Sequence, residues 1–123
     1  MTRILVIDDD PSIRQLIAYA LEDEGYQVVE ASDGSEALEL IGGTPPDIII
    51  LDMKMPGVDG WEFARRYEEI HTPRAPIIVL TAAKDAAERG ADVNAAAHVS
   101  KPFDLDVLLD QVSAVALALE EGK

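Results

Sequence analysis

The sequence alternates short apolar runs rich in β-branched residues with segments whose apolar residues recur at helical spacing. Short runs of this kind are typical of strands that are buried on both faces of a parallel sheet. We expect five such strands, at Ile4–Ile7, Val28–Val29, Ile48–Leu51, Ile77–Leu80 and His98–Val99. The alternation predicts an α/β protein.

Apolar residues spaced three and four positions apart predict helices between and after these strands. The first helix carries Ile13, Leu16, Ile17, Ala20 and Leu21, and the last carries Leu105, Leu108, Leu109, Val112 and Leu119. A third stripe consists of Phe63, Tyr67 and Ile70. Segments 35–41 and 84–94 complete the helices, and the second of them has little apolar stripe.

Residues that are typical of helix ends and turns lie at the boundaries between the predicted strands and helices. Pro11 suits a first helical turn, and Gly25 suits a helix end. Asp33-Gly34 opens the second helix, and we expect residues 42–46 to form a loop. Gly57 and Gly60 bracket a turn before the third helix, and we expect Asp104 to cap the last helix.

Five β/α units predict a doubly wound parallel sheet of strand order 2-1-3-4-5, with helices on both faces and right-handed crossovers. The length of 123 residues predicts a single domain over residues 1–123. In such a sheet the ligand site lies at the carboxyl ends of the strands, beside the switch between the first and third strands.

Polar residues follow four of these strands. The first is followed by Asp8-Asp9-Asp10, the third by Asp52, the fourth by Thr81 and the fifth by Lys101. Clustered carboxylates repel one another and favour a bound cation, and oxygen ligands without cysteine favour Mg²⁺ where phosphate is handled. A carboxylate can accept a phosphoryl group, while a metal, an ammonium and a hydroxyl neutralise its oxygens. The conjunction predicts phosphoryl chemistry. Asp10 we interpret as a helix cap or an outer charge.

The charge of the chain excludes several classes of partner. There are 24 Asp and Glu residues against 10 Lys and Arg, a formal net charge of −14, which disfavours nucleic acid and anionic membranes. Cysteine is absent, which suits the cytosol. The longest apolar runs have six residues, Leu16–Leu21 and Ala114–Leu119, and no signal peptide is recognisable. We therefore expect a cytoplasmic protein.

Four motifs resemble the receiver (CheY-like) domain of two-component response regulators. They are the segments 4–10 and 51–60, Leu80-Thr81-Ala82, and Lys101-Pro102-Phe103. The resemblance implies a (βα)5 flavodoxin-like fold and Asp52 as the phosphoacceptor. It implies that Asp8, Asp9, Asp52 and the backbone carbonyl of Lys54 hold Mg²⁺, that Thr81 is the switch hydroxyl, and that Lys101 pairs with phosphate. The Lys101–Pro102 bond is usually cis in this family.

The resemblance also implies partners. The phosphoryl donor would be a sensor histidine kinase or a histidine phosphotransfer protein, and the output an unidentified downstream protein or effector domain. Phosphorylation would act on a surface of the expected helix at 84–94, the expected strand at His98–Val99 and the last helix. One departure lies there, since His98 occupies a switch position where the family has Tyr or Phe.

Two alternatives stay open at this point. The run Ile7-Asp8-Asp9-Asp10 also resembles the start of haloacid-dehalogenase-like phosphatases, in which Asp8 would be the nucleophile. The second alternative is a degenerate receiver that acts as a constitutive interaction module. Apart from its own phosphorylation and dephosphorylation, we expect a signalling domain rather than an enzyme. The sequence does not separate a free-standing regulator from part of a longer one.

Overall fold

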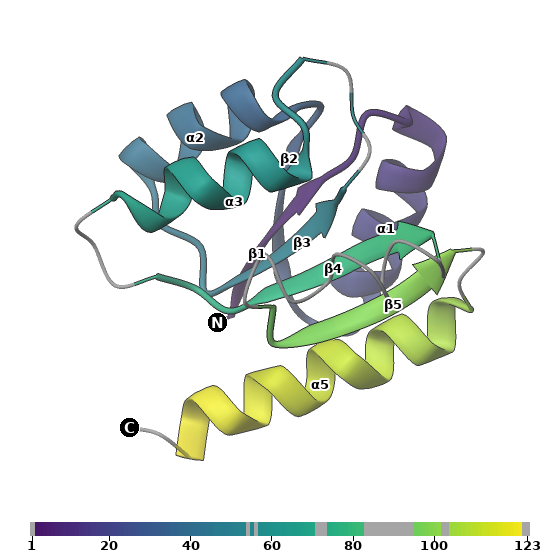
Figure 1. Ribbon diagram of the computed structural model, residues 1–123. Coiled ribbons are helices and arrows are strands. Elements are labelled where there is room, and N and C mark those ends of the chain that lie inside the picture. The colour runs from purple at the N-terminus through teal and green to yellow at the C-terminus, as the bar shows by residue number, and fades with distance from the viewer. Residues whose placement is uncertain are drawn as a thin grey trace.

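The computed structural model describes residues 2–53, 55, 57–70, 74–82, 95–101 and 104–121, with only the backbone for residues 81, 82 and 101. Its centre is a five-stranded parallel sheet of order β2-β1-β3-β4-β5 (Figure 1). The strands are β1 (Arg3–Ile7), β2 (Gln27–Ala31), β3 (Ile48–Asp52), β4 (Ile77–Ala82) and β5 (Ala97–Lys101). The described helices are α1 (Pro11–Asp23), α2 (Gly34–Gly43), α3 (Gly60–Glu68) and α5 (Leu105–Glu121). The predicted strand order and fold class are confirmed.

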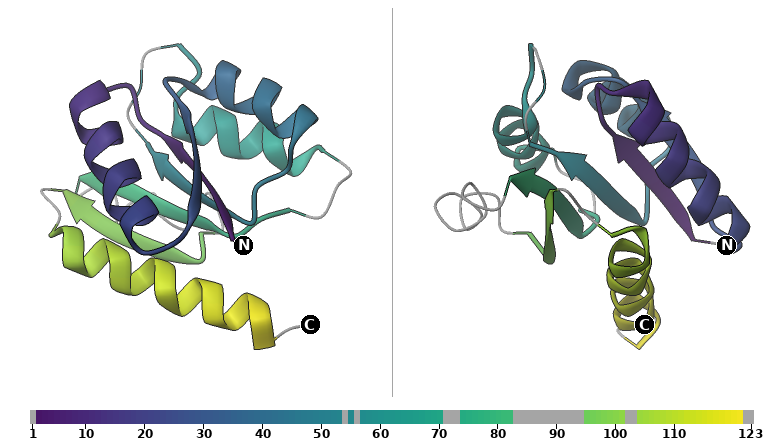
Figure 2. Two further views of the ribbon diagram at one scale, coloured as in Figure 1. Left: turned by 180° about the vertical axis from the view of Figure 1, so that it is seen from behind. Right: turned by 90° about the vertical axis from the view of Figure 1, so that its right-hand side faces the viewer.

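Helices cover both faces of the sheet. Figures 1 and 2 show α1 and α5 on one face and α2 and α3 on the other. Each face has its own apolar core: Ile17, Leu21, Leu108 and Val112 belong to the first, while Phe63 and others belong to the second. The alternation of side chains along a strand supplies both cores, because successive residues point to opposite faces.

The central strand β3 explains why its sequence is uniformly apolar. All five of its residues are buried, since β1 and β4 flank it and helices lie on both faces. The edge strand β2 has only one buried residue, Ala31. Strand β3 therefore places its last residue, Asp52, in an interior environment.

Aspartate side chains begin each described helix. Asp10 Oδ1 accepts a hydrogen bond from Ser12 N–H at 2.9 Å, and Asp33 and Asp59 accept from the third residue of α2 and α3. Asp104 accepts from Asp106 N–H at 2.9 Å at the start of α5. These bonds satisfy donors that have no partner inside the helix. The predicted capping roles of Asp10 and Asp104 are confirmed.

Two local expectations are wrong. Gly42 and Gly43 belong to the last turn of α2 rather than to a loop, and Thr44 N–H bonds to the carbonyl of Leu40 at 3.0 Å to extend that turn. Leu16, assigned to the buried stripe of α1, is 54% exposed, because the buried face is centred on Ile17 and Leu21. The predicted helix at 84–94 lies outside the described residues. None of the described helices is long and apolar enough to span a bilayer.

Candidate functional site

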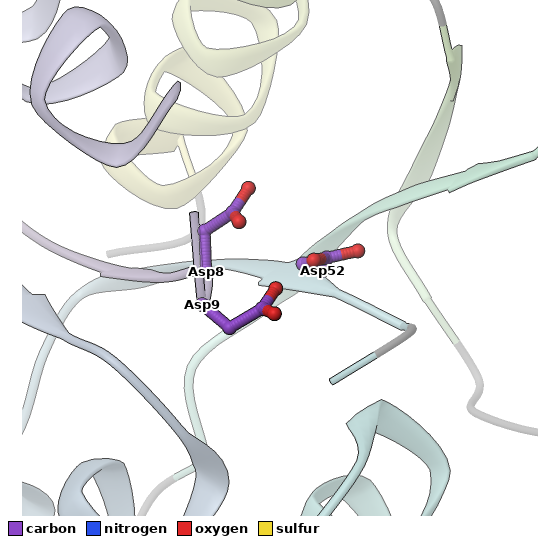
Figure 3. Close-up of side chains that lie close together, drawn as sticks. All are labelled: Asp8, Asp9 and Asp52. Atoms are coloured by element: carbon purple, nitrogen blue, oxygen red, sulfur yellow. The ribbon is translucent and has the colours of Figure 1, made fainter. Parts of the chain in front are cut away.

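The carboxyl ends of β1 and β3 bring three carboxylates together. Ile7 pairs with Leu51 in the parallel register, so the residues that follow, Asp8 and Asp52, are neighbours. One carboxylate oxygen from each of Asp8, Asp9 and Asp52 lies within 4.8 Å of the others (Figure 3). Asp8 is fully buried, Asp52 is 3% exposed and Asp9 is exposed. Two of the three carboxylates are thus in the interior, and the third is open to solvent.

Hydrogen bonds from backbone N–H groups hold the segments that carry the two buried aspartates. Asp8 N–H donates to the carbonyl of Ala31 at 3.2 Å, which extends the pairing of β1 with β2 past the end of the strand. Asp10 N–H donates to Asp8 Oδ1 at 2.9 Å. After Asp52, Met53 N–H donates to the carbonyl of Leu80 at 3.1 Å and holds the chain against β4. Asp10 caps α1 and is not a member of the cluster.

Glycines allow the segment after β3 to pass close to its neighbours. A Cβ atom at Gly60 would lie 2.6 Å from the Met53 Cα atom and 2.9 Å from the carbonyl oxygen of Asp52. A Cβ atom at Gly34 would lie 2.9 Å from the carbonyl oxygen of Val58. Gly57 has φ +73°, a conformation that glycine adopts without steric penalty. The first residues of α2 and α3 therefore both press against the segment that follows Asp52.

The other predicted site residues are placed less fully. The backbones of Thr81 and Lys101 lie at the ends of β4 and β5, where Thr81 pairs with Ser100 and Ala82 with Lys101. Their positions are at the same edge of the sheet as Asp52, which pairs with Leu80. His98 lies on β5 with an exposed side chain. Lys54, Pro102 and Phe103 lie outside the described residues, so the predictions made for them remain predictions.

The donor set suits a hard divalent cation. It offers only carboxylate oxygens, which Mg²⁺ prefers, and two of the three groups are buried where their repulsion is least screened by water. A bound cation would offset that repulsion. Among the described residues, this is the group of acidic side chains with spacing for a metal ion.

Sequence reasoning missed Arg14 and Glu30. The Arg14 guanidinium donates through Nη1 to the carbonyl oxygen of Asp8 at 2.9 Å and through Nε to Glu30 Oε1 at 3.1 Å. Arg14 stands four residues after the cap Asp10, one helical turn away, which was the available signal for its nearness to the acidic loop. Glu30 lies on β2, 16 residues after Arg14, and no local pattern in the sequence links the two residues.

The fold and the cluster define a doubly wound α/β domain with an acidic site at the carboxyl edge of its sheet. Its sequence matches the family described as the response regulator receiver domain over residues 4–113. The chain belongs to this family, whose members are the receivers of two-component systems.

Three similar proteins illustrate the range of the family. The response regulator MprA of Mycobacterium sp. (strain KMS) is 42% identical over 92% of this chain and 50% of its own length. Sporulation initiation phosphotransferase F of Bacillus subtilis (strain 168) is 37% identical over 89% of this chain and 90% of its own. The crystal structure of the response regulator TrrA from Thermotoga maritima, in complex with Mg(2+)-BeF, shares 37% identity with a TM-score of 0.83, covering 94% of this chain and 99% of that one.

These proteins differ in length. The chain spans about half of MprA but nine-tenths of the sporulation phosphotransferase. The shared part is therefore the receiver domain itself.

Proposed function

We propose that this chain is a phosphorylation-dependent switch that accepts a phosphoryl group on Asp52 from a phosphohistidine donor in the presence of Mg²⁺. The observation that carries the proposal is the convergence of Asp8, Asp9 and Asp52, with oxygens within 4.8 Å of one another, in a chain of the receiver family. The printed names of two relatives agree with it, one being a phosphotransferase and the other crystallised with Mg(2+)-BeF.

In the proposed reaction an Asp52 carboxylate oxygen attacks the phosphorus atom. The bond from phosphorus to the donor imidazole nitrogen breaks, the imidazole leaves with the electron pair, and an acyl phosphate forms on Asp52. Later attack by water on that phosphorus would release inorganic phosphate and restore the carboxylate. Burial of Asp52 at the end of β3 restricts the orientations open to the nucleophile.

Asp8, Asp9 and Asp52 would hold Mg²⁺, with the backbone carbonyl of Lys54 as a further ligand. The ion, when bound, supplies positive charge against the phosphoryl oxygens. Asp8 and Asp9 keep the site acidic enough to attract it. We assign phosphate pairing to Lys101 and the switch hydroxyl to Thr81, and the support for both is their position at the ends of the strands that follow β3 in the sheet.

The output would be a changed partner surface of the predicted helix at 84–94, β5 and α5. Phosphorylation would draw the Thr81 hydroxyl inward and partly bury His98, whose side chain is exposed on β5. Imidazole NMR shifts of His98, with and without beryllofluoride, test this part. Identical titration curves in both states would remove His98 from the switch. The donor would be a sensor histidine kinase or a histidine phosphotransfer protein.

The phosphoacceptor is tested by incubating the protein with Mg²⁺ and acetyl phosphate. We expect one added phosphoryl group, mapped by mass spectrometry to Asp52 and absent from Asp52→Asn. Asp59→Asn is the matched control, because Asp59 caps α3 outside the cluster and asparagine caps equally well. Full labelling of Asp52→Asn refutes the assignment. Trapping on Asp8 instead would favour the phosphatase-like alternative.

A further inference from the structure

Arg14 joins the acidic segment between β1 and α1, Asp8–Asp10, to the edge strand β2. Its Nη1 donates to the Asp8 carbonyl oxygen at 2.9 Å, and its Nε donates to Glu30 Oε1 on β2 at 3.1 Å. The Arg14 side chain is only 16% exposed, and its bond to the Asp8 carbonyl is partly buried, whereas its bond to Glu30 is exposed. Glu30 is the residue opposite Val6 in the register of β1 with β2. The guanidinium is thus held between the helix, the loop and the sheet.

The carbonyl that Arg14 binds belongs to the peptide that joins Asp8 to Asp9. Strand β1 ends at Ile7, and Asp8 N–H still bonds to the carbonyl of Ala31. Beyond that bond, rotation of the Asp8–Asp9 peptide would change the separation of the two carboxylates. The Arg14 bond restrains this rotation, and so it holds the two carboxylates at the separation seen in the cluster.

We propose that Arg14, braced by Glu30, is a positioning residue that keeps the carboxylates of Asp8 and Asp9 in a metal-binding arrangement. This inference rests on the metal site of the proposed function. It goes beyond that site because neither residue belongs to the acidic cluster, and the guanidinium acts through a backbone carbonyl.

The charge of Arg14 and its positioning role predict opposite changes in metal affinity when the guanidinium is removed, which makes the proposal testable. By charge alone, the Arg14 guanidinium repels a divalent cation, so removing it would tighten metal binding. By position, removing it frees the Asp8–Asp9 peptide and loosens binding. Loss of groups that orient metal ligands weakens metal affinity, and we expect a loss of about three- to tenfold here, because the contact reaches the ligands through the backbone.

The test measures Mn²⁺ binding by electron paramagnetic resonance, in which free Mn²⁺ is counted directly, with Mg²⁺ as competitor. The variants are Arg14→Met, which keeps an unbranched stem, and Arg14→Lys, which keeps the charge but cannot reproduce the guanidinium fork. Both should bind three- to tenfold more weakly, by the estimate above. Arg66→Met is the matched control, because it removes an equivalent pair, Arg66 Nε to Glu62 Oε1 at 3.0 Å, on α3.

Measurements are made well below the melting temperature of each variant, so a purely structural role lowers stability without changing the affinity of the folded protein. Glu30→Gln should weaken binding less than Arg14→Met, and adding it to Arg14→Met should change nothing further. Equal or tighter binding by Arg14→Met, or wild-type affinity in Arg14→Lys, overturns the inference and leaves the proposed function intact. Absence of Mn²⁺ binding by the wild-type protein overturns both.

Discussion

Replacing Asp9 with asparagine should stabilise the metal-free protein. Its carboxylate and those of Asp8 and Asp52 have oxygens within 4.8 Å of one another. Two unit charges at that distance repel by about 0.9 kcal/mol in water and about 3.5 kcal/mol at an effective dielectric constant near 20. Asp9 is exposed, so the lower value applies to each of its two pairs. Repulsion between adjacent aspartates persists in the unfolded chain, which leaves a net gain of about 1 kcal/mol.

Thermal unfolding in a chelator at low salt measures this gain. For a domain of this size, 1 kcal/mol corresponds to a rise in Tm of about 4 °C. The rise should shrink as NaCl is added, because salt screens exposed charges. Asp10→Asn is the matched control, since it removes a charge from the same loop, keeps the cap of α1 and lies outside the cluster.

Metal should reverse the order of stability. At a Mg²⁺ concentration tenfold above its Kd, the wild-type protein gains about 1.4 kcal/mol from binding, while the Asp9→Asn variant, which we expect to bind more than tenfold more weakly, gains less than about 0.4 kcal/mol. The Tm values of the two proteins should therefore cross as Mg²⁺ is titrated. If Asp9→Asn is no more stable than wild type in chelator, or if Asp10→Asn gains as much, repulsion within the cluster is not the cause.

Three further predictions concern the framework of the site. In urea unfolding, Gly60→Ala should lose about 1–3 kcal/mol of unfolding free energy, because the added Cβ atom would clash with backbone atoms. Gly42→Ala, which has open space around it, should gain up to about 1 kcal/mol in the same assay. Tyr67→Phe should lose about 1–2 kcal/mol in the same assay, because Ala75 N–H donates to the Tyr67 hydroxyl at 2.7 Å, and an unchanged midpoint would contradict this. Burial, with two nearby glutamates, raises the pKa of Tyr26 above its ordinary value of 10.0. The neutral Tyr26 hydroxyl therefore contributes to the free energy of unfolding below pH 10, and this contribution is lost as the pH rises through the pKa of the folded protein. Tyr26→Phe should flatten that alkaline loss, measured as Tm against pH.

The order of strands and the edge that carries the site could be predicted from the sequence because both depend on local patterns. The apolar run at 48–51 is long enough to identify a central strand. Asp52 follows this run directly, so it lies at the end of the strand in any arrangement of the loops. Asp8 could be placed beside it because two adjacent parallel strands end at the same edge.

Details set by contacts between distant segments could not be predicted. The exposure of Leu16 depends on how α1 is rotated against the sheet, and helical spacing alone allows several rotations. Gly42 and Gly43 look like a loop locally, but the helical hydrogen bonds of α2 continue over them as far as the bond from Thr44 N–H to the carbonyl of Leu40. The Arg14 bridge joins the carbonyl of Asp8 to the side chain of Glu30, which lies 16 positions after Arg14 on β2, and no local sequence pattern links these two groups.

The two close approaches at the glycines also constrain how this sequence can diverge. A side-chain clash can be relieved by a smaller partner, so such positions vary in pairs. At Gly34 and Gly60 the obstacles include backbone atoms, the carbonyl oxygens of Val58 and Asp52 and the Cα atom of Met53. No substitution elsewhere removes a backbone atom. Among descendants of this sequence, both positions should therefore stay glycine without any compensating partner, even where the surrounding loop changes freely.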